Sequence, residues 1–245
     1  MRICYVLNRF PELSQTFVLA QLVGLLELGH DVEVLAAGPK PGEPSHESFE
    51  RARRRYDLDR RTTYTGTPRR LLLRPLHALG VAVRRGWRYP GEVTRTLDLG
   101  RFGWFAASGT VLSMSRPLLD RRRSYDAIVA HFGPQGVIAA GLRSAGLLQG
   151  PLLTVYHAHD LTSAPRRLGK GLYGELFRQG EAHVAISHRG AERLRVLGAP
   201  EHKISVHHLG VDVDAFAPAG DRADTGTLRL LSVGRLVEKK GFQNA

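Results

Sequence analysis

Short apolar runs alternate with helical patterns along most of the chain, and this alternation is the feature that most constrains the fold. Helices are predicted at residues 15–28, 135–145, 170–179 and 188–197, the first with Ser14 as its N-cap. The runs typical of buried strands are residues 2–7, 31–36, 127–131, 152–157, 183–186 and 204–207. Strands that alternate with helices are typical of parallel sheets. We therefore expect an α/β fold with one parallel sheet and helices on both faces.

Residues 39–123 interrupt this alternation. Residues 68–88 combine apolar residues with flanking arginines, which is typical of a basic amphipathic segment at a membrane surface. The alternative is a surface helix that packs its apolar side on the sheet. Pro75 would kink or split a helix here. Residues 97–119 are expected to contain a further helix.

Positive charge is concentrated in this interruption. The 245 residues include 35 basic and 23 acidic side chains, a net charge of +12. The stretch from Arg51 to Arg88 holds twelve arginines against Asp57 and Asp59. A charge run of this kind is either a solvated excursion or a surface for an anionic partner, for which an anionic membrane is the candidate.

Cysteine usage and hydropathy indicate the environment of the chain. Cys4 is the only cysteine, so no disulfide can form within the chain and a reducing compartment is expected. The longest apolar candidate, residues 17–28, is too short to span a membrane and contains Gln21 and Glu27. No cleavage site of small residues precedes Gly29, so neither a spanning helix nor a signal peptide is expected.

The sequence changes character near residue 220. Residues 215–227 are rich in Ala, Gly, Asp and Pro, which predicts a linker, and residues 228–233 read as a new strand. We expect a first domain at residues 1–220 and the beginning of a second at 221–245. The strand runs into Gly234-Arg235 and then Lys239-Lys240-Gly241. A helix start of this kind can bind an anion such as a diphosphate, although the two lysines could also be a solvated helix start.

Three further motifs lie where strands end. The first, residues 8–17 (NRFPELSQTF), includes Ser14 and Thr16; the second, residues 156–160 (YHAHD), includes His157 and Asp160. The third comprises residues 184–198 and 203–216 and contains Gly210 and Asp212. Each has a structural alternative: a cap, a buried histidine or a turn. His131, His159 and Asp160 could suggest a metal site, but their spacing is not diagnostic.

In this order, the four motifs resemble the retaining glycosyltransferases of family 4, especially those of bacterial exopolysaccharide assembly. The resemblance covers the whole chain and implies the Rossmann-like N-terminal acceptor domain of a GT-B fold. It implies transfer of a sugar from UDP or GDP to a glycan or lipid-linked acceptor, with retention and without a metal or other cofactor. The implied roles are contact of His157 with the transferred sugar, diphosphate binding by Gly234, Arg235 and Lys240, and a cleft lined by Ser14, Thr16, Asp160, Gly210 and Asp212.

Two features depart from the family pattern. The first loop lacks the paired glycines of many members, and the chain stops before the pair of glutamates, seven residues apart, that contacts the donor. We expect the chain alone to be inactive and its last strand, residues 228–233, to be poorly ordered. The expected location is the cytoplasm, peripheral to the inner membrane face.

Two other functions remain open. A non-enzymatic adaptor could be built on the same fold. A basic nucleic-acid-binding protein would explain the charge, but the arginines lie outside any recognised nucleic-acid module, so nucleic acid is not an expected partner.

Overall fold

The computed structural model describes residues 1–12, 14–39, 47–211, 213, 230–234 and 236–244. The chain divides into two compact units, Met1–Leu209 and Gly210–Ala245. Within the described residues no helix is both long enough and apolar enough to cross a membrane.

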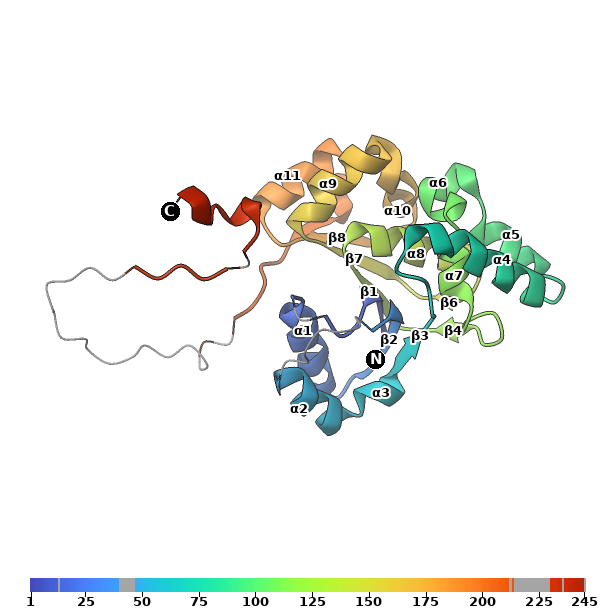
Figure 1. Cartoon of the computed structure of the whole chain (residues 1–245), viewed down its shortest axis with the longest axis horizontal. Coiled ribbons are helices and arrows are strands. Elements are labelled where there is room, and N and C mark those ends of the chain that lie inside the picture. The colour runs from blue at the N-terminus through green and yellow to red at the C-terminus, as the bar shows by residue number, and fades with distance from the viewer. Residues whose placement is uncertain (13, 40–46, 212, 214–229, 235, 245) are drawn as a thin grey trace, which may run out of the picture. The chain divides into compact units, whose positions relative to one another are not determined.

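The first unit is built on a seven-stranded parallel sheet (Figure 1). Its strand order is β3-β2-β1-β5-β7-β8-β9, so the chain builds outward from β1 in one direction and then, from β5, in the other. The strands are β1 (Arg2–Arg9), β2 (Asp31–Gly38), β3 (Thr62–Tyr64), β5 (Ala127–His131), β7 (Leu152–Tyr156), β8 (Ala182–Ala185) and β9 (Ile204–Val206). A separate short pair joins β4 (Arg123–Ser124) to β6 (Leu148–Gln149). In open sheets, ligands bind beyond the strand carboxyl ends where the order reverses, which here is between β1 and β5.

Helices cover both faces of the sheet. They are α1 (Thr16–Glu27), α2 (Glu47–Tyr56), α3 (Leu58–Arg61), α4 (Arg74–Arg85), α5 (Pro90–Thr96), α6 (Leu99–Ala107), α7 (Thr110–Ser115), α8 (Gly133–Ser144), α9 (Ala158–Leu168), α10 (Gly174–Gln179) and α11 (His188–Val196). Alternate residues of each strand point to opposite faces, so Cys4 and Val6 join the core beneath α4 to α11, whereas Tyr5 and Leu7 join the core beneath α1, α2 and α3. The expected α/β fold with a parallel sheet is confirmed.

Helix α8 lies unusually close to its neighbours. A Cβ atom on Gly133 would lie 2.5 Å from the ring of Tyr173, and one on Gly136 would lie 2.7 Å from Thr154 of β7. A Cβ on Gly141 would meet Val111 of α7 at 2.8 Å. These glycines let α8 approach the sheet and two helices at distances that a side chain would forbid.

Several local predictions need correction. The N-cap of α1 is Gln15, and Ser14 is an exposed residue before it, because the first helical turn begins one residue later. Pro75 does not interrupt a helix: it lies in the first turn of α4, where a missing N–H costs nothing, after a 3-10 turn at Leu71–Leu73. Residues 97–119 form two helices, α6 and α7, because Gly109 adopts a left-handed conformation between them.

Two other predicted elements differ from the structure. Residues 170–179 form a 3-10 turn at Lys170–Tyr173 followed by α10. In the second unit, the described residues 230–233 of the predicted last strand are exposed and are not a strand, since no described segment pairs with them. A 3-10 turn at Glu238–Lys240 follows. The domain boundary near residue 220 falls among residues outside the described ranges and stays a prediction.

Candidate active site at the carboxyl edge of the sheet

Two histidines meet at the carboxyl edge of the sheet. His131 is the last residue of β5, and His157 follows the last residue of β7. Because β5 and β7 are paired parallel strands, their ends lie side by side. The Nδ1 atom of His131 is 3.2 Å from Nε2 of His157, and both side chains are buried.

Gln21 of α1 fixes the hydrogen positions of this pair. Its Oε1 atom is 2.8 Å from Nε2 of His131. An amide oxygen only accepts, so His131 donates from Nε2 and its Nδ1 accepts the Nε2 hydrogen of His157. The relay therefore runs from His157 through His131 to Gln21, with both imidazoles in the Nε2-protonated neutral form.

Aromatic rings enclose the pair. The His131 ring is stacked on Tyr5 at 5.7 Å between centroids, and the His157 ring lies 4.6 Å from Phe17 and 4.5 Å from Phe132. Burial lowers the pKa of His157 to about 4. Burial and the adjacent His157 lower the pKa of His131 to about 3. Both histidines are therefore neutral at pH 7.

Asp160 ties the two strand-to-helix turns together. Its carboxylate accepts the backbone N–H of His157 at 2.8 Å and that of Gly133 at 2.9 Å. These N–H groups lie at the starts of α9 and α8, where helix geometry leaves them without intrahelical partners. Burial raises the pKa of Asp160 to about 7, against the opposing effect of these hydrogen bonds. The His-x-x-Asp pattern thus holds the site together.

The backbone is strained where β5 turns into α8. Phe132 has φ 72° and ψ 136°, a backbone conformation that residues other than glycine rarely adopt. Such a residue costs about 1–3 kcal/mol and persists where surrounding contacts impose it, often at functional sites. Here the Phe132 N–H donates to the carbonyl of Val155, and the ring packs against His157.

A cavity of about 180 Å³ opens beside the ends of β1 and β2. Its polar lining includes Asn8, Arg74 and Gln135, the last in the first turn of α8. Burial lowers the pKa of Arg74, and Arg9 contributes to this shift. A guanidinium and a helix N-terminus make the cavity suited to hydroxyl or anionic groups.

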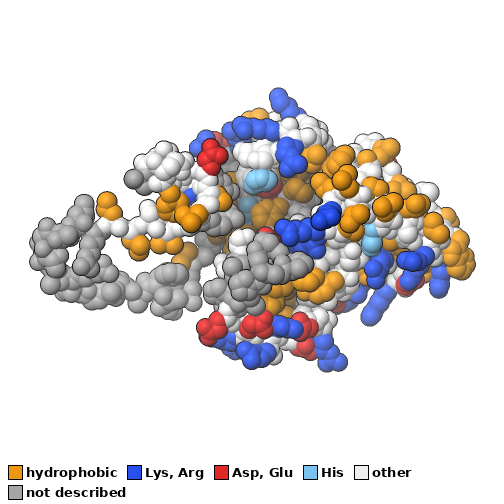
Figure 2. All heavy atoms as spheres, viewed as in Figure 1, with side chains coloured by type: hydrophobic (Ala, Val, Ile, Leu, Met, Phe, Trp, Pro, Cys, Tyr) orange, Lys and Arg blue, Asp and Glu red, His pale blue; other side chains and the backbone are white. Residues whose placement is uncertain are grey.

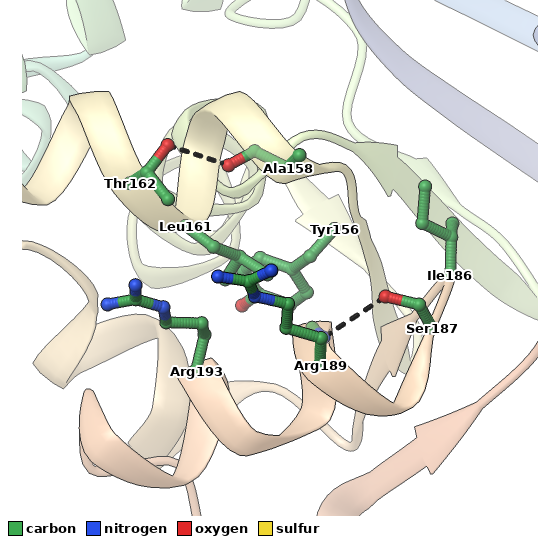
Figure 3. Close-up of a pocket in the computed structure, with 9 residues that line it drawn as sticks. Tyr156, Ala158, Leu161, Thr162, Ile186, Ser187, Arg189 and Arg193 are labelled. Carbon is green, nitrogen blue, oxygen red and sulfur yellow. Dashed lines mark hydrogen bonds between the residues drawn. The ribbon is translucent and has the colours of Figure 1, made fainter.

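A second cavity, of about 300 Å³, lies between α9 and α11 beyond the ends of β7 and β8 (Figure 3). Tyr156, Leu161 and Ile186 supply an apolar lining. Arg189 and Arg193 project from α11 along one side of it (Figure 3). Ser187 accepts the N–H of Gly190 and caps α11.

The structure gathers only some of the residues expected in the site. His157 and Asp160 lie together in the interior, whereas Ser14, Thr16 and His159 are exposed. No group of three or more His, Cys, Asp or Glu suited to a metal occurs among the described residues. The other expected residues belong to the second unit: Gly210, Gly234 and Lys240 are exposed, and Asp212 and Arg235 lie outside the described residues.

Sequence reasoning missed several residues of this edge. His131 ends a predicted strand, as His157 does. Because parallel strands end at the same edge of a sheet, this position could have placed the two histidines together. Gln21 and Phe132 carry no comparable signal, because the rotation of α1 and the strained turn are set by tertiary packing.

An open parallel sheet with buried polar groups and cavities beyond its carboxyl edge defines this unit as a ligand-binding α/β domain. Residues 14–215 match the model of Glycosyltransferase Family 4, and the chain belongs to this family. The expected family is thereby confirmed.

Curated relatives extend beyond the matched region. WcaL of Escherichia coli (strain K12), provisionally named a colanic acid biosynthesis glycosyltransferase, is 32% identical over 100% of this chain and 59% of its own length. AmsK of Erwinia amylovora, named an amylovoran biosynthesis glycosyltransferase, is 30% identical over 99% of this chain and 58% of its own. The chain therefore spans less than two thirds of these relatives.

Among solved structures, Anabaena Alr3699/HepE in complex with UDP matches with a TM-score of 0.47 and 13% identity. The match covers 90% of this chain and 47% of that chain.

Proposed function

We propose that this chain forms the acceptor-binding part of a retaining glycosyltransferase of cell-surface polysaccharide assembly. The enzyme would transfer a sugar from a UDP- or GDP-sugar to a hydroxyl of a glycan or lipid-linked acceptor, in the cytoplasm. The family match over residues 14–215 is the observation that carries this proposal. The exopolysaccharide setting comes from the names of the relatives WcaL and AmsK.

In this proposal, charge develops on the diphosphate leaving group, and Arg235 and Lys240 offset it from the turn that begins at Gly234. Fixed positive charges that meet a developing negative charge are often the largest contribution to catalysis. No metal or other cofactor takes part. Gly210 and Asp212 are assigned to the same proposed cleft.

His157 acts here as a neutral group that orients the sugar. Its lowered pKa keeps it uncharged at pH 7, and its Nε2 hydrogen is already donated to His131. It is therefore poorly placed to carry a proton through the reaction. The strained backbone of Phe132, which lies against His157, supports a functional rather than a purely structural role for this turn.

The test uses a fusion of this chain to the C-terminal portion that WcaL possesses beyond the matched region. Transfer from radiolabelled UDP- and GDP-sugars to a lipid-linked acceptor is measured. Arg235→Ala with Lys240→Ala should abolish transfer, whereas Arg54→Ala with Arg55→Ala, which removes equal charge from α2, should not. Unchanged turnover in the first double variant would exclude the proposed diphosphate site.

His157 is tested separately in the same protein. His157→Ala should lower kcat at least about tenfold while most of the folded enzyme remains at the assay temperature. A large fall in Tm, with full activity in the fraction that stays folded, would instead assign His157 a structural role.

A further inference from the structure

Five large apolar side chains form an exposed stripe on α4 and its flanks. They recur every three or four residues, so they share one side of the helix, and they are 60–90% exposed: Leu72, Leu76, Leu79, Val83 and Trp87. The opposite side of α4 packs on α7 and joins the core through Ala78 and Val81. Exposed apolar surface of this extent marks an interaction site in a soluble domain.

Further apolar side chains extend this surface beyond α4. Leu97, Leu99 and Trp104, before and within α6, are 41–61% exposed. Figure 2 shows hydrophobic side chains gathered over the end of the molecule that carries α4 to α6. The two tryptophans of the chain, Trp87 and Trp104, both belong to it. Tryptophan is the residue most typical of the boundary between lipid and water.

The charge around this surface is strongly positive. Residues 68–116 contain nine arginines but only Glu92 and Asp98 as acidic residues. Within the part of the chain that the structure describes, seven of these arginines form no ion pair: Arg69, Arg70, Arg74, Arg84, Arg88, Arg95 and Arg116. A second copy of the chain would bring an equally positive surface against it, so the charge favours an anionic partner.

The structure divides the arginine-rich stretch that the sequence presented as one surface. On α2 and α3, arginines pair with carboxylates: Arg51 with Glu47 at 3.1 Å and Arg53 with Asp59 at 2.9 Å. These two helices also belong to the core on the other face of the sheet. One flat membrane therefore cannot contact α2 and α4 together, and the α4 side carries most of the unpaired charge, whereas on α2 only Arg54 and Arg55 form no ion pair among the described residues.

A basic pocket of about 570 Å³ adjoins the apolar stripe. Its lining includes Leu76 of the stripe, His77, Arg84 and Arg116, together with Arg85, which is ion-paired with Asp120. The Nδ1 atom of His77 is buried and has no hydrogen-bond partner within the described residues. The two unpaired guanidinium groups, of Arg84 and Arg116, and the imidazole nitrogen fit a phosphodiester, the group that every anionic phospholipid carries.

We propose that the α4–α6 surface docks on an anionic phospholipid bilayer. The stripe from Leu72 to Trp87 enters the boundary between headgroups and acyl chains, and the pocket of Arg84 and Arg116 takes a headgroup phosphate. This places the first unit at the membrane without a spanning helix among the residues that the structure describes. Docking does not depend on the proposed transfer activity, so the two can fail separately.

The two tryptophans provide the test. The chain is mixed with vesicles of phosphatidylcholine alone or with phosphatidylglycerol added, and tryptophan emission and co-sedimentation are recorded. We expect a blue shift, quenching by brominated lipid and sedimentation with the anionic vesicles only, all lost at 1 M salt where charges are screened. Equal binding to neutral vesicles, or no binding to anionic vesicles at low salt, would overturn the proposal.

Variants separate this surface from general charge. Arg84→Gln with Arg116→Gln should weaken partitioning about thirtyfold, on the basis of the typical contribution of a basic residue near an anionic surface. Leu76→Ser with Leu79→Ser and Val83→Ser should weaken it on the order of a hundredfold, since apolar burial is lost. Arg54→Gln with Arg55→Gln on α2 removes the same charge elsewhere and should change it little. An equal loss in this control would show non-specific attraction and refute the assignment.

Discussion

His157 donates its Nε2 hydrogen to Nδ1 of His131 across 3.2 Å, and this contact makes His131 the residue that orients His157. His131 in turn is fixed by Gln21 of α1, 2.8 Å away. The candidate site therefore depends on an element that is distant in sequence from both strand ends. Its orientation is set by hydrogen bonds between neutral groups.

Replacement of His131 tests this dependence. His131→Phe keeps an aromatic ring against Tyr5 but leaves the buried Nε2 hydrogen of His157 without an acceptor. An unsatisfied buried donor costs about 1–3 kcal/mol, which urea unfolding at pH 7 would measure. Imidazole ¹⁵N NMR should show His131 and His157 of the parent each as a single Nε2-protonated tautomer, since the His157 side chain also accepts the backbone N–H of Asp160. An Nδ1-protonated His131 or His157 in the parent would contradict the relay.

Asp160→Asn tests the link between α8 and α9. The amide retains one acceptor oxygen, so either the N–H of Gly133 or that of His157 loses its partner. We expect the free energy of unfolding to fall by about 1–3 kcal/mol. Glu201→Gln, which breaks the exposed ion pair with Arg195, is the control and should have a much smaller effect. Similar effects of the two changes would mean that Asp160 does not join the turns.

Close packing of α8 predicts opposite signs for two Gly-to-Ala changes. Gly136→Ala places a methyl group 2.7 Å from Thr154 and Leu176 and should destabilise the protein by about 1–3 kcal/mol. Gly24→Ala in α1 meets no atom within 4 Å and should stabilise by about 0.5–1 kcal/mol, because alanine is the better helix former. Thermal and urea unfolding of both variants measure the two changes in the free energy of unfolding. Stabilisation by Gly136→Ala would exclude the tight contact.

Three buried histidines predict loss of stability in mild acid. Burial lowers the pKa of His131 to about 3 and those of His157 and His183 to about 4, from an ordinary 6.5. Between pH 6.5 and 4 the unfolded chain thus binds three protons that the native protein does not. Asp160 has the opposite effect. Its raised pKa keeps it protonated in the native state, so at this residue the native protein binds one proton that the unfolded chain does not. The free energy of unfolding should fall by up to about 3 kcal/mol for each unit that pH falls in this window.

Urea unfolding measured from pH 7 to pH 4.5 gives this slope directly. The net difference between the two states is two protons, three on the histidines less one on Asp160. His183→Phe removes one of these two and should therefore halve the slope. A free energy of unfolding that does not change over this range would show that these histidines are accessible to protons in the native state.

The strands were predictable because each buried run carries its own signal. Residues 127–131 coincide with β5, and the predicted strand at residues 152–157 ends one residue beyond β7. The strand β3 was missed because it is three residues long and lies at an edge within the arginine-rich stretch. The helix α9 was missed because His157 and Asp160 looked like site chemistry, although they also form a helix start.

Half of the candidate site could be anticipated from sequence. His157 and Asp160 follow a recognisable strand end, but the partner of His157 depends on which strands are neighbours. Likewise, Arg53 and Arg84 look equivalent in sequence, and only the fold shows that one is paired with carboxylates on one face of the sheet and the other is unpaired on the opposite face.

The absence of side chains at Gly133, Gly136 and Gly141 has a consequence for ligand binding. Helix α8 is held on three sides, so the turn of His131 and Phe132 that leads into it cannot shift without a collision. Helix α1 has free space around Gly24 and offers Gln21 from an exposed position. Induced fit at this edge should therefore be one-sided. We expect a bound ligand to displace α1, whereas α8 keeps its position.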